Sequence, residues 1–204
     1  MTDISLTVTS KEIPAFFPLL QRGFKIKAQV GCSIQDMLCG QFNINPDYIE
    51  ERISTVFLDA KPVDDVESAI IRNGSILALS AAMPGLVGAT FRRDGPISSF
   101  RSAITYSEKV ECGDLQEGFV VLKLFNLLIK ELGPNFLKQG ICIPKNRLHE
   151  FVKQLPDIFS AELKKIEIDG RRSELKTLVE PDVMPLTETI RLRVSTNIEV
   201  EGHN

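Results

Sequence analysis

Tryptophan is absent from the 204 residues, histidine occurs twice and cysteine four times. His149 and His203 are therefore the only imidazoles available as a general base near neutral pH. The chain has no run of about 18 apolar residues, and its start lacks a basic segment followed by an apolar one. The formal net charge of -3 gives no basic field to attract nucleic acid or acidic lipid. We therefore expect a cytoplasmic protein that binds neither nucleic acid nor membranes.

The cysteines Cys32, Cys39, Cys112 and Cys142 show no metal-binding spacing, because no two of them are separated by only two residues. Cys32 and Cys39 are seven residues apart, which on a helix leaves about 10 Å along the axis, too far for a disulfide. We interpret all four as reduced core residues, and we expect no metal and no other cofactor.

The first half reads as strands with short helices between them. Residues 4–8 and 24–30 alternate apolar and polar side chains, which is typical of strands with one face toward water. The first strand is either residues 4–8 or residues 15–20, and Pro18 would confine the latter to a sheet edge. Ser33 followed by Asp36 predicts the capped start of a short helix, and Asn45 before Pro46 predicts a second one.

Residues 53–85 are the most informative stretch, with predicted strands at 53–58 and 76–79. An acidic loop with Asp64, Asp65 and Glu67 lies between them, followed by an Asn73-Gly74 turn. The order of hairpin, helix, strand, turn and strand predicts a small β-grasp, ubiquitin-like unit.

Residues 25–88 resemble the sulfur-carrier proteins of thiamin and molybdopterin synthesis. The matching segments are FKIKAQVGCSIQDML, VFLDAKPVDD and IIRNGSILALSAAMPG. The resemblance implies a β-grasp fold whose last strand, in that family, leads to a C-terminal Gly-Gly that is activated as an adenylate and then a thiocarboxylate. Here the Gly-Gly is missing, and the corresponding exit at Met83-Pro84-Gly85 continues into more chain.

The second half is predicted as α+β. Residues 119–132 are apolar except for a stripe of Lys123, Asn126 and Lys130, which at spacings of three and four favours a buried or interfacial helix ending at Gly133-Pro134. Further expected elements are an amphipathic helix at 148–155, a short helix capped by Asp157, an Asp169-Gly170 turn, a strand at 190–194 and a polar tail at 197–204.

Glycine, proline and serine between the halves favour a domain junction. We therefore predict an α+β protein with an N-terminal β-grasp unit at residues 1–90, a connecting segment at 91–117 and a smaller α+β domain at 118–204.

One candidate site is an anion- or partner-binding loop with Gly85, Gly88, Arg92 and Arg93. Free backbone amides and guanidinium groups together suit oxyanions, although the spacing matches no phosphate-binding motif, and a flexible linker with solvated arginines is the simpler interpretation. Cys32, at a helix start, is the cysteine best placed for a lowered pKa. We interpret His149 as a surface histidine, and the pairs Asp64-Asp65 and Glu50-Glu51 as solvated acids.

No set of residues in the sequence forms a catalytic motif, and the sequence does not decide whether the chain is an enzyme. The favoured hypothesis is a non-catalytic binding or assembly protein, built on the β-grasp module and engaging a protein partner or a second copy of itself. The alternative is a small-molecule enzyme or sulfur-relay component that uses the Cys32 thiolate.

Overall fold

The computed structural model describes residues 1–93, 95, 97–107, 113–154, 163–179 and 187–196, and it confirms the α+β class. The chain divides into two compact units. The central unit is Leu20–Gly133, and the terminal unit combines Met1–Leu19 with Pro134–Asn204. The divisions fall inside two helices, α1 (Pro18–Gln21) and α5 (Leu128–Gln139).

The central unit contains a mixed sheet with the strand order β4-β3-β5-β6-β2. Its strands are β2 (Phe24–Val30), β3 (Thr55–Leu58), β4 (Lys61–Val63), β5 (Ile76–Ser80) and β6 (Gln116–Phe125). β5 and β6 pair in parallel, and all other neighbours in this sheet are antiparallel. The predicted strands at 24–30, 53–58 and 76–79 are thus present, with small shifts at their ends.

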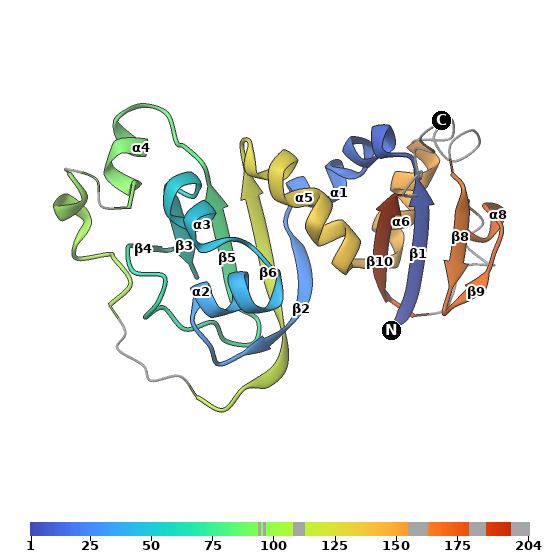
Figure 1. Cartoon of the computed structure of the whole chain (residues 1–204), viewed down its shortest axis with the longest axis horizontal. Coiled ribbons are helices and arrows are strands. Elements are labelled where there is room, and N and C mark those ends of the chain that lie inside the picture. Colours follow the sequence, from blue (N-terminus) through green and yellow to red (C-terminus); the bar gives the residue numbers. More distant parts are fainter. Residues whose placement is uncertain (94, 96, 108–112, 155–162, 180–186, 197–204) are drawn as a thin grey trace, which may run out of the picture. The chain divides into compact units, whose positions relative to one another are not determined.

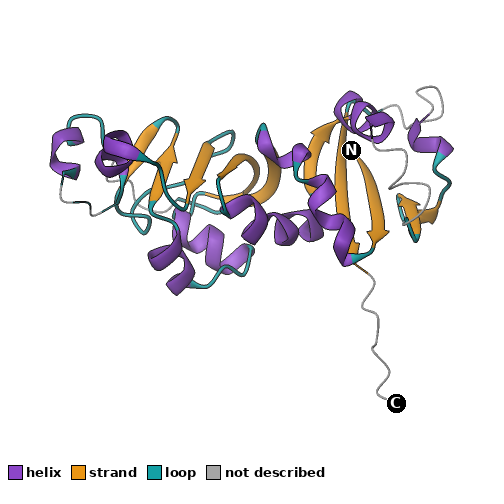
Figure 2. Cartoon of the chain, turned by 90° about the horizontal axis from the view of Figure 1, so that it is seen from above, coloured by secondary structure: helices purple, strands orange, loops and turns teal. Residues whose placement is uncertain are grey.

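Short helices cover one face of this sheet: α2 (Ile34–Asp36), the π-helix η2 (Met37–Gln41) and α3 (Pro46–Arg52). Both predicted caps form, because Ser33 Oγ accepts from the Asp36 N–H at 3.0 Å and Asn45 Oδ1 accepts from the Asp47 N–H at 2.9 Å. Figure 1 shows α2 and α3 in front of the strands, and Figure 2, seen from above, shows helices on one side of these strands. Their buried side chains, which include Ile34, Met37, Leu38 and Ile49, form the core with the inward residues of the strands.

The predicted helix at residues 119–132 is wrong over its first half. β6 continues to Phe125, and α5 starts at Leu128 and passes through Gly133-Pro134 to Gln139. Val120, Leu122 and Leu124 are buried while the residues between them are more exposed, which is the period of a strand. The outward residues of β6 are also mostly apolar, so the sequence does not show the alternation of apolar and polar residues that is typical of a strand.

The glycine-rich connection predicted after Gly85 is partly helical. α4 spans Gly85–Phe91, and a 3₁₀ helix, η3, spans Ser98–Arg101. Phe91 packs against Phe57 of β3 with ring centroids 5.2 Å apart, so this segment is held against the sheet of the central unit.

The strands of the terminal unit are ordered β7-β10-β1-β8-β9, with both parallel and antiparallel neighbours. Its strands are β1 (Thr2–Val8), β7 (Ile141–Pro144), β8 (Lys165–Ile168), β9 (Arg171–Arg172) and β10 (Thr189–Thr196). β1 and β10 pair in parallel along their whole length, and the predicted Asp169-Gly170 turn joins β8 to β9. The helices of this unit are η1 (Ser10–Phe16), α6 (Lys145–Gln154) and α8 (Lys176–Val179), and the predicted apolar residues Leu148, Phe151 and Val152 of α6 are buried.

The first predicted strand is therefore residues 4–8, within β1, whereas residues 15–20 are largely helical. β1 pairs with β10 and β8 instead of forming a hairpin with β2. The domain boundaries that we predicted at residues 90 and 118 stay a prediction, and the two compact units are a separate division of the chain. The helix expected at Asp157, the polar tail with His203, and Cys112 lie outside the described residues.

Candidate functional site

Gly85 and Gly88 both belong to α4 and are not successive loop amides. Gly88 is buried, and a Cβ built on it would lie 1.7 Å from the carbonyl oxygen of Met83. Glycine is therefore required there for the close approach of α4 to the strand exit. Gly85 has a positive φ of 71°, which a residue with a side chain rarely adopts.

Arg93 points toward backbone carbonyls. Its Nε donates to Asp64 O at 3.1 Å, and its Nη1 donates to Ile49 O and Ile53 O at 3.3 and 3.4 Å. Arg92 is exposed, and its carbonyl oxygen accepts from Arg101 Nη2 at 3.2 Å. The four residues of the predicted anion loop thus have different surroundings, and Arg93 holds α3 and the segment after β4 together.

Arg101 is a buried cation that the sequence analysis missed. Its side chain is 2% exposed and forms a bidentate ion pair with Asp64. Its Nε donates to Thr90 O at 2.7 Å, and its Nη1 donates to Thr105 Oγ1 at 2.9 Å. Arg101 therefore fastens the segment of α4 and η3 to the sheet of the central unit, and Asp64 is an ion-pair partner instead of a solvated acid.

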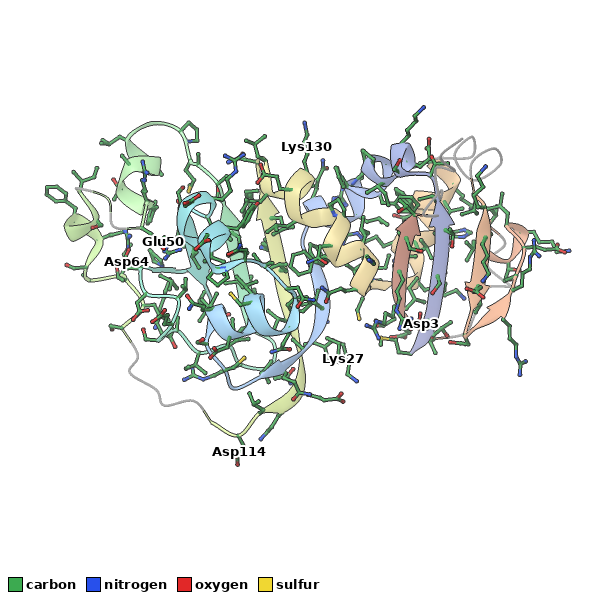
Figure 3. All side chains as sticks on the ribbon, in the orientation of Figure 1. Asp3, Lys27, Glu50, Asp64, Asp114 and Lys130 are labelled. Carbon is green, nitrogen blue, oxygen red and sulfur yellow. The ribbon has the colours of Figure 1, made fainter. Side chains whose placement is uncertain are left out.

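A cavity of about 700 Å³ with a mainly polar lining lies beside these arginines. Its carboxylates come from α3 and from the segment after β4, and Figure 3 labels one from each, Glu50 and Asp64. Asp65 also lines it, and hydrogen bonds from Ser68 and from the Glu67 N–H hold the pKa of Asp65 below its usual range. Among the described residues, no group of three or more His, Cys, Asp or Glu side chains is arranged to hold a metal ion.

Cys32 is 6% exposed, and its Sγ contacts Gln29 and Gln41. It lies 3.4 Å from Gln29 O, to which it donates, and it accepts from Gln41 Nε2 at 3.6 Å. Ser33, not Cys32, is the N-cap of α2. In Cys39, burial and the nearby Asp36 carboxylate raise the pKa of the thiol. These surroundings favour the predicted core role over a thiolate nucleophile.

His149 is partly buried, and its Nδ1 lies 3.4 Å from Leu178 O. Among the described residues no cysteine or serine hydrogen-bonds to this ring in the manner of a nucleophile and its base. The imidazole thus has a structural contact between α6 and α8.

The face of the central sheet opposite α2 and α3, against which Phe91 of α4 also packs, carries a mostly apolar pocket of about 680 Å³. Its floor includes Phe57, Ile76, Ala78 and Phe125 from β3, β5 and β6, three strands that lie side by side in Figure 1. Met83 and Pro84 line one side, and the polar lining includes Thr55 and Lys123. We call this cavity the sheet pocket.

Next to the sheet pocket, the same face bears a patch that we call the apolar stripe, made of Phe119 and Val121 of β6 and Ile76 of β5. Phe119 and Ile76 are 38% and 40% exposed, and Ile76 pairs with Val121 across the two strands. On the β2 side, Lys25 lies opposite Val121 and Lys27 lies opposite Phe119. Lys27 forms an ion pair with Glu117 at 2.9 Å, and Figure 3 shows Lys27 on β2.

We compared the chain with protein-family models, with curated proteins and with solved structures, and no match was found. No helix in the described part of the chain is long and apolar enough to cross a membrane. The fold therefore defines an α+β protein with mixed β-sheet.

Proposed function

We propose that the chain is a non-catalytic binding protein in which the central unit is a β-grasp module that engages a protein partner. The observation that carries the proposal is the open sheet face with its apolar stripe. Large apolar side chains gathered on the surface of a soluble protein usually mark a contact site.

The strand order supports the β-grasp interpretation. A parallel pair, β5 and β6, lies at the centre of the sheet with antiparallel strands on both sides, and the helical segment α2–η2 follows β2 directly. The position that we expected for the first strand of the hairpin is taken by β6. Because β6 comes after β5 in the chain, the module would have its strands in a rotated order along the sequence.

The charges on the open face indicate the chemistry of the partner. Lys25 and Lys27 flank the apolar stripe, and the ion pair between Lys27 and Glu117 offsets both of their charges. Asp59 lies beside Ile76 of the apolar stripe, and its carboxylate accepts from the Ile76 N–H at 2.7 Å and from the Ser75 hydroxyl at 3.0 Å. The electrostatic complement is a surface with apolar side chains and a carboxylate placed to meet Lys25, so we favour a different protein over a second copy.

The test compares Phe119→Asp with Leu86→Asp, an equally drastic change on α4, where Leu86 is 77% exposed. Proteins captured from native lysate by the wild type should be lost with Phe119→Asp and retained with Leu86→Asp. Light scattering of the pure wild type should give the mass of one chain. If Phe119→Asp captures the same proteins as the wild type, the proposal is contradicted. If the wild type is a dimer and Phe119→Asp dissociates it, the molecule that binds the apolar stripe is a second copy of the chain.

The alternative, chemistry at a cysteine thiolate, has weaker support. Cys32 is almost fully buried and its sulfur is in contact with Gln29 and Gln41. A thiolate nucleophile needs access and an electropositive environment.

A further inference from the structure

We propose that the sheet pocket binds a small amphipathic carboxylate, with its apolar body on the floor of the pocket and its carboxylate at Lys123. At about 680 Å³ the pocket is within the size range of small-molecule sites. Most of its lining is apolar, and only a few polar groups converge on it, which is the usual composition of such sites.

The first observation for a ligand is an unpartnered hydroxyl. Thr55 lines the pocket and is 1% exposed, and its Oγ1 has no hydrogen-bond partner among the described residues. A buried hydroxyl without a partner costs free energy, so it is retained only where something offsets the cost. Its neighbour across the strands, Ser80, is satisfied, because the Ser80 hydroxyl donates to Ala82 O and accepts from Asn126 Nδ2, both at 3.2 Å.

The second observation is the placement of the cation. Lys123 lies opposite Ala78, a floor residue, and also lines the pocket. Its stem passes over Gly23, where a built Cβ would lie 3.1 Å from Lys123 Cγ and 3.5 Å from Lys123 Cε. Gly23 therefore leaves room for a lysine that lies along the sheet at the rim of the pocket.

These groups define the ligand class. The floor suits an aliphatic chain or an aromatic ring, and the ammonium group of Lys123 suits a carboxylate through a charge-assisted hydrogen bond. Among the described residues of the lining, Asp59 is the one carboxylate, and it already accepts two hydrogen bonds, so it is less available to hold a cationic ligand. The Thr55 hydroxyl can donate to a polar atom on the ligand body.

The inference can be tested separately from the proposed function, although Ile76 of the apolar stripe also lies on the floor of the sheet pocket. Phe119 and Val121 carry the docking proposal and do not line the sheet pocket, whereas Thr55 and Lys123 line it and lie outside the apolar stripe. Phe119→Asp tests docking, and changes at Thr55 and Lys123 test the pocket.

The experiment titrates the full chain with octanoate and 2-naphthylacetate, and with their uncharged counterparts octanol and 2-naphthylacetamide. Calorimetry gives the affinities, and amide NMR signals locate the site. We expect saturable shifts at Thr55, Ala78 and Lys123, and acids that bind at least about fivefold more tightly than the uncharged compounds. Lys123→Met should remove this preference, and Thr55→Val should weaken binding by about threefold or more.

Lys25→Met is the matched control, because Lys25 is on the same face but does not line the pocket; octanoate should bind this variant as it binds the wild type. Ala78→Leu, which fills the floor, should abolish binding. The proposal is overturned if no acid gives saturable shifts at the pocket. It is also overturned if octanol, or the cationic counterpart octylamine, binds as tightly as octanoate. It is equally overturned if Lys25→Met weakens the binding of octanoate as much as Lys123→Met does, because binding would then depend on the positive charge of the surface and not on the pocket. The comparison of acids with uncharged compounds needs only the wild type, so a variant that fails to fold does not weaken the test.

Discussion

Replacing Arg101 with Met should destabilise the central unit more than replacing Arg52, Arg92 or Arg93. The change leaves the Asp64 carboxylate without its cation and removes the donors to Thr90 O and Thr105 Oγ1. Breaking a fully buried ion pair costs about 3–5 kcal/mol. The Asp64 side chain is 35% exposed, so water recovers part of this loss, and we expect a decrease of about 2–3 kcal/mol in the free energy of unfolding.

Urea unfolding followed by circular dichroism measures the effect, since the chain has no tryptophan to serve as a fluorescent probe. For a chain of this size the expected loss corresponds to a decrease in Tm of about 4–12 °C. Arg92→Met is the control, because Arg92 is exposed and contributes its backbone carbonyl, not its guanidinium, to the network. It should change the stability by no more than about 0.5 kcal/mol.

A double-mutant cycle with Asp64→Asn separates the ion pair from the other contacts of Arg101. The two single changes together should cost clearly more than the double variant, because each leaves the other partner uncompensated. The reasoning is refuted if Arg101→Met is as stable as Arg92→Met, or if the effects of the two changes simply add.

Three other outcomes follow from the structure. Gly88→Ala should lower the Tm by several degrees, because the added Cβ would collide with Met83 O. Gly40→Ala should not lower the Tm, because no atom lies within 4 Å of a Cβ built on Gly40. Equal effects of the two changes would contradict the packing described for α4. Arg52 and Tyr48 donate hydrogen bonds to the Glu131 carboxylate and lower its pKa, so its contribution to stability is present above its unfolded pKa of about 4.3 and is lost as pH falls through the lower folded pKa. NMR titration should show the Glu131 pKa rising toward its usual value in Arg52→Met, and an unchanged pKa would contradict this cause. When the native protein is labelled with a thiol reagent and analysed by peptide mass spectrometry, Cys32 should react slowly, and its rate of labelling should increase greatly on unfolding. Rapid labelling of Cys32 in the native protein would instead support the thiolate hypothesis.

Local features of the fold could be predicted from the sequence. Ser33 and Asn45 cap their helices, and Asp169-Gly170 makes its turn, because each of these structures depends on neighbouring residues. The amphipathic helix α6 and the alternating strands β1, β2 and β10 were predictable for the same reason, since their apolar period follows from having one buried face.

Features that depend on distant residues could not be predicted. Asp64 and Arg101 are 37 residues apart, and nothing in the local sequence of either indicates the other. The partner of β1 is β10, at the opposite end of the chain, and the partner of β2 is β6. Sequence spacing alone favoured nearer partners.

The error at β6 has a physical cause that bears on function. A strand with one wet face normally alternates apolar and polar residues, but Phe119, Val121 and Phe125 are outward and apolar. They made residues 119–125 look like a buried helix. Phe119 and Val121 belong to the apolar stripe on which the docking proposal is based, and Phe125 lines the sheet pocket. A strand that departs from its expected period in this way can be a signal for a binding face.

Site-specific photo-crosslinking tests the docking proposal most directly. A benzoylphenylalanine at position 119 should give a discrete covalent adduct with one protein in the cells that make this chain, because Phe119 lies in the apolar stripe. The same group at position 100, where the native Phe100 is 84% exposed on η3, should give none. Adducts that are equally strong at both positions, or absent at position 119, would contradict the assignment of the open sheet face as the docking surface.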